Sequence, residues 1–202
     1  MKVEARVHQV WDRIERWVSD HAPPFLLTLA PPATEDKLAE LESVLGRVLP
    51  DDFKVSYRIH NGQILRGHSW DASRFLFDEG LRQIQGMVEN RETLRQAPIS
   101  KIDLQLVDTY GPLKAGWHEF PWLPFTSGDG YHSVMLDLDP PPEGTYGQVF
   151  ESISDEVVNR WVAVSFVDYL ESFAVALEAG LYAFWEAPGE KGIVTVKSLE
   201  WR

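Results

Sequence analysis

Two short helices joined by a tight corner constrain this chain of 202 residues more than any other stretch. From Leu38 onward, leucines recur at helical spacing until Gly46, a residue suited to the left-handed conformation that often follows a helix. Thr34 is a good N-cap for this helix, because its hydroxyl can accept a hydrogen bond from an early N–H group. A second helix is predicted over residues 52–60, with Asn61-Gly62 as its stop.

The composition restricts the possible functions. The chain has no cysteine, which rules out thiol nucleophiles, disulfides and zinc–thiolate sites and fits a reducing cytoplasm. Its formal net charge of −12 disfavours nucleic acid and favours a basic protein partner. No apolar run is long enough to cross a membrane, so we expect a cytoplasmic protein with no membrane partner.

The hydrophobic periodicity changes along the chain from a helical to a strand-like spacing, which predicts an α+β fold. We expect a single domain over 1–202, in which a mainly antiparallel sheet has helices packed chiefly on one side. Helices are predicted over residues 3–19, 35–45, 52–60, 83–96 and 166–179. Strands are predicted over residues 122–126, 131–138, 147–153 and 157–164.

Several finer features are also predicted. Asp51 or Asp52 can cap the second helix of the pair, and Ser165 can cap the helix over 166–179. Ile64-Leu65 suggests a short strand, and we expect one more edge strand close to the C-terminal end, at residues 193–196.

One hairpin carries the best candidate for a metal-dependent hydrolytic site. Asp129, His132, Asp137 and Asp139 could bind a divalent cation, but their spacing matches no established metal loop. The alternative is turn chemistry at Asp129 and solvation of the strand end at Asp137 and Asp139. We assign no metal, no cofactor and no catalytic residue, and we interpret His60-Asn61-Gly62 as a helix end.

Two groups of residues together resemble a known superfamily. The first group spans the helix pair, and the second covers the predicted central strands and closing helix. Their most telling members are Leu49, Pro50, Tyr57, Asn61, Gly62, Trp122, Pro124, Asp137 and Gly147. The pattern over residues 10–182 resembles the SUKH superfamily, which includes yeast regulators of cell-wall assembly. The segments 97–118 and 183–202 depart from it, as an extended middle and a C-terminal extension.

The resemblance implies a SUKH-like fold and a protein-binding function without catalysis. Bacterial members of that superfamily resemble immunity proteins that neutralise toxins, often nucleases, and a basic toxin would suit the acidic charge of this chain. Immunity is therefore our first hypothesis. A regulatory scaffold for cell-wall assembly or morphogenesis is the alternative, and the metal-dependent hydrolase is a third.

We expect the partner to meet loops on one side of the sheet, because loops on a rigid scaffold usually carry recognition. Aromatic side chains there would anchor the partner, and aspartates beside them would steer a basic one. The predicted partner-binding residues are Trp70, Asp71, Asp108, Tyr110, Asp129 and Asp139.

Overall fold

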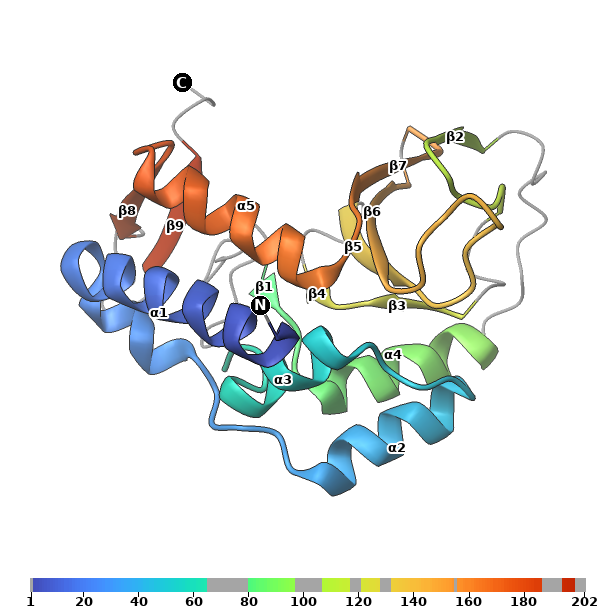
Figure 1. The fold of residues 1–202 in the computed structure, drawn as a ribbon, viewed down its shortest axis with the longest axis horizontal. Helices are drawn as coiled ribbons and strands as arrows, with labels where there is room; N and C mark the ends of the chain where they lie inside the picture. Colours follow the sequence, from blue (N-terminus) through green and yellow to red (C-terminus); the bar gives the residue numbers. More distant parts are fainter. Residues whose placement is uncertain are drawn as a thin grey trace.

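The computed structural model describes residues 2–64, 80–96, 107–116, 121–127, 132–154, 156–186 and 194–198. Most helices come early in the chain and most strands later, and Figure 1 shows the large sheet at one end of the molecule beside the helices. The elements are α1 (Val3–His21), the 3₁₀ helix η1 (Pro23–Thr28), α2 (Glu35–Leu45), α3 (Asp51–Ile59), β1 (Gly80–Leu81), α4 (Ile84–Gln96), β2 (Asp108–Tyr110), β3 (Trp122–Pro124), β4 (Thr126–Ser127), β5 (His132–Asp137), β6 (Gln148–Ile153), β7 (Val158–Ala163), α5 (Phe166–Glu178), β8 (Tyr182–Glu186) and β9 (Val194–Ser198).

The predicted helix pair is present as α2 and α3. The Thr34 hydroxyl accepts from the backbone N–H of Lys37 at 3.4 Å, and Gly46 closes α2 with a φ of 65°. At α3, however, neither aspartate acts as an N-cap, since Pro50 holds that position and no side chain caps it. Asp52 is instead buried and accepts from the backbone N–H of Val167, at the start of α5.

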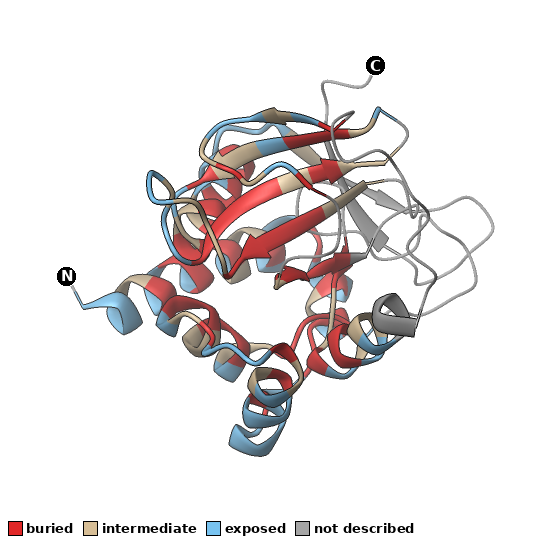
Figure 2. Ribbon diagram, turned by 90° about the vertical axis from the view of Figure 1, so that its right-hand side faces the viewer, coloured by how far each residue is buried: buried red, intermediate tan, exposed pale blue. Residues whose placement is uncertain are grey.

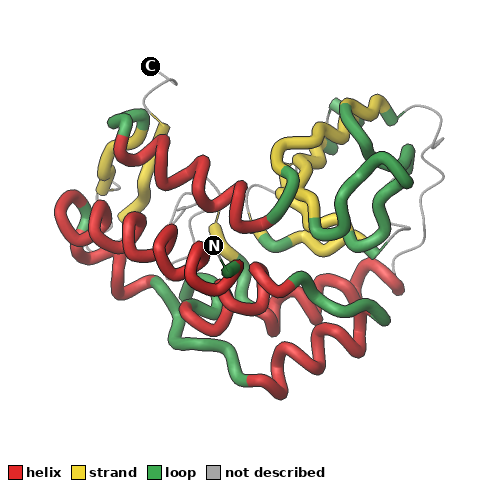
Figure 3. The backbone as a smooth tube through the Cα atoms, in the orientation of Figure 1, coloured by secondary structure: helices red, strands yellow, loops and turns green. Residues whose placement is uncertain are grey.

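Helix α1 packs its apolar stripe inward against α3 and α5. Trp11 is 1% exposed and its indole N–H donates to Ser56 Oγ on α3 at 2.8 Å, so this tryptophan belongs to the core. Ion pairs also connect α1 to α5, since Arg6 of α1 binds Asp168 and Glu171 of α5. Figure 3 shows these helices to one side of the strands of the large sheet.

The large sheet has the strand order β2-β7-β6-β5-β3. Its pairs are antiparallel except β2 with β7, which run parallel, so the sheet is mixed but mainly antiparallel. Helices α4 and α5 contact the strands of the large sheet directly, and other helices lie below the sheet in Figure 2. The predicted α+β fold, with helices chiefly on one side, is confirmed.

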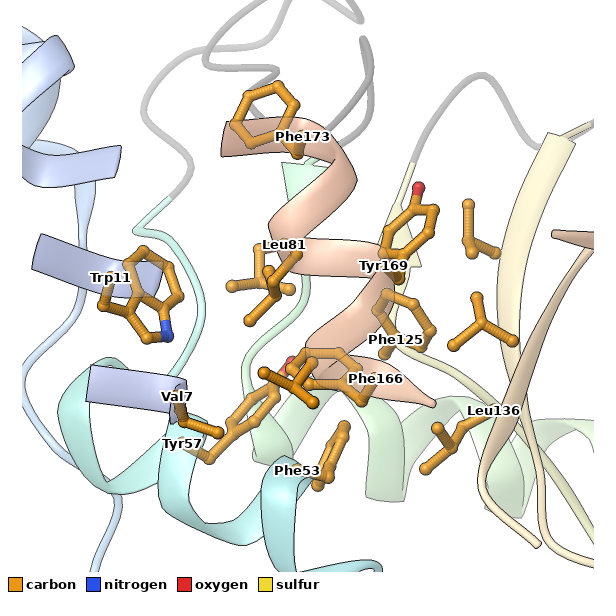
Figure 4. Close-up of a cluster of buried hydrophobic side chains, with 14 of the residues drawn as sticks. Val7, Trp11, Phe53, Tyr57, Leu81, Phe125, Leu136, Phe166, Tyr169 and Phe173 are labelled. Carbon is orange, nitrogen blue, oxygen red and sulfur yellow. The ribbon is translucent and has the colours of Figure 1, made fainter. Parts of the chain in front are cut away.

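Aromatic rings from both layers meet in the main core (Figure 4). Phe166 packs edge-on against Phe53 of α3 and against Phe125 beside β3, with ring centroids 5.0 and 5.1 Å apart. Phe53 also stacks on Tyr57, one helical turn further along α3. Because aromatic side chains bury large apolar areas, this cluster joins helix pair, closing helix and sheet into one core.

Three predictions that concern strands need correction. The strand expected over 122–126 is two strands, since β3 pairs with β5 in the large sheet whereas β4 pairs with β1. Ile64 lies in no strand. Asp108–Tyr110, predicted to lie in the partner-binding loops, is the edge strand β2, and its pairing with β7 fifty residues later has no local signal.

The C-terminal strand expected at 193–196 is present as β9. It pairs antiparallel with β8 in a separate two-stranded sheet, instead of adding to the large one. The strand also contacts η1, and Tyr182 of β8 packs edge-on against Phe173 of α5. This hairpin therefore lies against the helical layer.

Candidate protein-binding surface

A short segment crosses the face of the large sheet that points away from the helices, which we call the outer face. This segment, residues 110–116, is called the strap. Leu113 of the strap is 8% exposed and joins a second apolar cluster with Trp122, Met135 and Phe150 of the outer face. Trp122 and Phe150 pack edge-on with centroids 4.8 Å apart. The outer face is therefore covered by the chain itself.

Asp137 is the centre of a polar network at the edge of this cluster. Its carboxylate is fully buried and accepts from the indole N–H of Trp122 at 3.1 Å and from the side chain of Gln148 at 2.9 Å. Trp122 and Gln148 lie directly opposite Asp137 on the two neighbouring strands. Burial raises the pKa of Asp137, while these hydrogen bonds act to lower it. The interpretation of Asp137 as a solvated strand end is wrong, because three strands converge on it.

Gln148 extends the network to the strap. Its side-chain nitrogen also donates to the Pro112 carbonyl at 2.7 Å, and its oxygen accepts from the Thr145 N–H at 3.1 Å. A Cβ at Gly144 would lie 2.9 Å from the same Pro112 carbonyl, so only glycine allows the close approach there. One buried side chain thus fixes both the strap and the β5–β6 loop.

The β5–β6 loop also holds the corner between α2 and α3. Gly147 has a φ of 82°, and a Cβ there would lie 2.6 Å from Pro50 Cγ. The hydroxyl of Tyr146 donates to the Val48 carbonyl at 2.6 Å, and burial raises the pKa of Tyr146. Tyr146 and Val48 still expose 45% and 65% of their surface, so a rigid junction presents apolar side chains to solvent.

Charges beside this junction are largely balanced. Asp139 Oδ2 lies 2.5 Å from Lys114 Nζ of the strap, and Asp139 Oδ1 lies 3.9 Å from Arg47. We expected Asp139 to act as a free carboxylate that steers a basic partner. It has two cationic neighbours within its own chain, which reduces the field that it projects into solvent.

Among the other predicted partner-binding residues, Asp108 and Tyr110 are exposed on the edge strand β2, Tyr110 by 56%. Trp70, Asp71 and Asp129 lie outside the described residues. The structure adds Val48, Tyr146, Arg47 and Lys114, which the sequence did not indicate. In the sequence, Val48 is an apolar residue in a Gly–Pro corner and Tyr146 is a tyrosine between glycines. Neither pattern predicts that the side chain is exposed.

The metal hypothesis receives no geometric support from the part of the chain that the structure describes. Asp137 directs its carboxylate at protein donors, and His132 lies at the opposite end of β5. No group of three potential ligand side chains occurs among the described residues. Likewise, no helix in this part of the chain is long and apolar enough to span a membrane.

Three more residues of the predicted family pattern, Tyr57, Asn61 and Gly62, lie at one further junction. Tyr57 is buried and its hydroxyl donates to the Arg82 carbonyl at 2.9 Å. The Asn61 side chain accepts from the N–H of Ile84, the first residue of α4, at 3.1 Å. Gly62 has a φ of 70°, and a Cβ there would lie 2.5 Å from the Arg82 carbonyl oxygen. This pattern therefore joins α3 to the start of α4.

Leu49 and Pro124 complete that pattern. Leu49 is 1% exposed in the main core, and its N–H donates to Glu42 Oε1 at 2.8 Å. Pro124 ends β3 opposite Met135. His60, next to Asn61, places Nε2 2.7 Å from Glu15 Oε1 and its ring edge-on to Trp11. Its contacts are thus with the helical layer.

These features define a class: an α+β domain whose helix pair is joined to a mixed sheet by glycines, with one exposed tyrosine on an edge strand and another on a rigid loop. The sequence model of the SMI1 / KNR4 family (SUKH-1) matches residues 32–172, so the chain belongs to that family. The resemblance noted in the sequence is confirmed.

Individual relatives agree. The chain is 28% identical to the "Cell wall biosynthesis/cell cycle regulator smi1" of Schizosaccharomyces pombe, over 86% of this chain and 36% of that protein. It is 25% identical to the "Glucan synthesis regulatory protein" of Neurospora crassa, over 84% and 38%. A shorter match, 39% identical over 30% of this chain and 13% of the relative, is to human "F-box only protein 3". The chain thus spans well under half the length of these relatives.

Proposed function

We propose that this chain is a protein-binding regulatory module that acts without catalysis. Its membership of the SMI1 / KNR4 family carries the proposal, since the fungal relatives are named as regulators of cell-wall biosynthesis and glucan synthesis. These names favour the regulatory alternative over the immunity hypothesis that the sequence alone placed first. By extension, we propose that the module serves cell-wall assembly or a related signalling process.

The exposed side chains best suited to contact a partner are Tyr110, on the edge strand β2, and the pair Tyr146 and Val48, where the β5–β6 loop meets the α2–α3 corner. We call these three side chains together the loop surface. All three are large side chains that remain substantially exposed although the backbone carrying them is held by hydrogen bonds and strand pairing. Aromatic side chains on rigid backbone make good anchors, because little conformational entropy is lost when they are buried. Asp108, exposed beside Tyr110, adds a charge that attracts a basic partner.

Electrostatics support a basic protein as the partner. The formal net charge of −12 repels phosphate backbones and speeds association with a cationic surface. The same charge is the observation that keeps toxin immunity as a second candidate, because a nuclease must itself attract phosphate. A regulator should bind several partners with modest affinity, whereas an immunity protein should bind one toxin tightly and inhibit it.

Capture from an extract of the source cells, with the full chain as bait, tests the proposal. We expect the parent chain to retain specific proteins, and Tyr110→Ala combined with Tyr146→Ala to retain them at least tenfold less. Val175→Ala is the matched control, since Val175 is 52% exposed on α5, away from the loop surface. Binding kinetics with each captured protein, then purified, should show faster dissociation for the double variant.

Two outcomes would contradict the proposal. If the parent and the folded double variant retain the same proteins equally well, the loop surface is not the contact. If the purified chain turns over a substrate, or binds no protein specifically, the non-catalytic protein-binding role is wrong. A single tight partner with toxin activity would instead favour immunity.

A further inference from the structure

Two buried polar atoms of β7 have no hydrogen-bond partner within the described residues, and the side chains that carry them contact the two ends of the strap. They are Asn159 Oδ1 and Trp161 Nε1. Asn159 is fully buried, and its amide nitrogen donates to the Gly116 carbonyl at 3.0 Å. A Cβ at Gly111 would lie 2.5 Å from Trp161 Cβ, so the strap passes directly over this tryptophan. An unpaired buried donor and acceptor both cost stability, because each gives up hydrogen bonds to water.

The strap is held on the sheet by three kinds of contact that also hold bound peptides: an apolar side chain in a cluster, an ion pair and a hydrogen bond to the backbone. Leu113 inserts into the cluster with Trp122 and Phe150, and the next residue, Lys114, pairs with Asp139. The Pro112 carbonyl accepts from Gln148 on the sheet. The Leu113 N–H donates back to the Gly111 carbonyl at 2.9 Å, so the strap forms a compact turn that presents Leu113 inward.

We propose that the strap is a built-in occupant of a peptide-docking site on the outer face, and that a partner segment with an apolar residue followed by a basic one displaces it. The apolar residue would take the place of Leu113, and the basic residue would take that of Lys114 at Asp139. The two unpaired atoms supply one acceptor and one donor, which matches the N–H and carbonyl of a peptide backbone. This inference rests on the proposed protein-binding function and names the partner's chemistry.

Charge complementarity explains why the incoming segment should be basic. Once Lys114 leaves, Arg47 at 3.9 Å is the remaining ion-pair partner of Asp139 among the residues that the structure describes, in a chain with a net charge of −12. The strap competes with any such segment for the same contacts. Weakening the strap should therefore raise the apparent affinity for a partner, because a larger fraction of the protein is then competent to bind.

The test uses a capped synthetic peptide with the strap's own sequence, residues 110–116, added to the full chain. Nuclear magnetic resonance reports the indole N–H of Trp161, assigned with Trp161→Phe. We expect the peptide to shift this signal, and to bind Leu113→Ala at least tenfold more tightly than the parent chain. Lys114→Ala gives a second readout that leaves the apolar cluster intact, and a Leu113→Asp version of the peptide should not bind.

Equal peptide affinity for the parent chain, Leu113→Ala and Lys114→Ala would overturn the inference, as would an unshifted Trp161 signal at saturating peptide. If Leu113→Ala fails to fold, the Lys114→Ala result decides. Capture of partner proteins separates the two proposals. If the chain retains partner proteins but does not bind the peptide, only the strap inference is wrong. If the chain retains no partner protein, the proposed function is wrong.

Discussion

The carboxylate of Asp52 accepts a hydrogen bond from the backbone N–H of Val167, 2.9 Å away, although 115 positions of sequence separate the two residues. The same carboxylate accepts from the N–H of Phe53 at 2.9 Å. A residue of α3 therefore binds an unpaired N–H at the start of α5, where the helix dipole also favours negative charge. Burial raises the pKa of Asp52, while both hydrogen bonds act to lower it.

Replacing Asp52 should therefore cost much more than replacing its neighbour. We expect Asp52→Ala to lower the free energy of unfolding by about 1–3 kcal/mol, because it leaves the Val167 N–H buried without a partner. Asp51→Ala is the matched control, since 85% of the Asp51 side chain is exposed, and should cost less than about 0.5 kcal/mol. Urea titrations of the three proteins measure both values. Equal losses would mean that the bond to Val167 contributes nothing.

Leu41 is fully buried on the inward face of α2. Truncation to alanine removes apolar contacts and leaves a cavity, so Leu41→Ala should cost about 2–5 kcal/mol. Glu40→Ala, one residue earlier and exposed, should leave the free energy of unfolding nearly unchanged. A chemical melt that shows no loss for Leu41→Ala would contradict the packing of α2 on the core.

Alanine substitutions at Gly62 and Gly46 distinguish the cost of a left-handed backbone from the cost of a steric clash. Both have a left-handed φ, 70° and 65°, but a Cβ at Gly62 would lie 2.5 Å from the Arg82 carbonyl oxygen, whereas one at Gly46 has nothing within 4 Å. Gly46→Ala should cost about 1–2 kcal/mol, from the left-handed conformation alone. Gly62→Ala should cost clearly more, because the backbone of residue 82 must also move. Thermal melts of the two variants make the comparison, and equal losses would show that the junction is loose.

The ion pairs between α1 and α5 predict a response to acid. Burial alone would raise the pKa of Asp168, but hydrogen bonds from Ser165 and Arg6 outweigh burial and lower this pKa below its ordinary value. A carboxyl group with a lowered folded-state pKa stabilises the protein above its unfolded pKa, and this stability is lost as pH falls through the folded pKa. Asp168→Asn should therefore destabilise the chain at pH 7 and approach the parent below about pH 4.

Denaturant titrations at several pH values measure this convergence. Glu40→Gln, an exposed carboxyl of α2, serves as the control and should track the parent throughout. A gap between Asp168→Asn and the parent that stays constant from pH 7 to pH 3 would show that ionisation of Asp168 is not the cause.

The sequence by itself determined the helices, much of the sheet and the family. Leucines at helical spacing between Thr34 and Gly46 specify α2 to the residue, because caps and periodicity are local signals. The hairpin of β5 and β6, and the helix that begins after Ser165, were also predictable from alternation and capping. The family resemblance needed only the order of such local motifs.

Only the tertiary structure decided what the polar residues do. Asp52 and Asp137 carry the same side chain as the exposed Asp51, yet both are buried, because donors from distant strands and helices converge on them. The parallel pairing of β2 with β7 and the path of the strap over Trp161 likewise depend on residues about fifty positions apart. Periodicity and capping report a residue's immediate neighbours, whereas burial, hydrogen-bond partners and exposed surface are set by contacts that form only when the whole chain has folded.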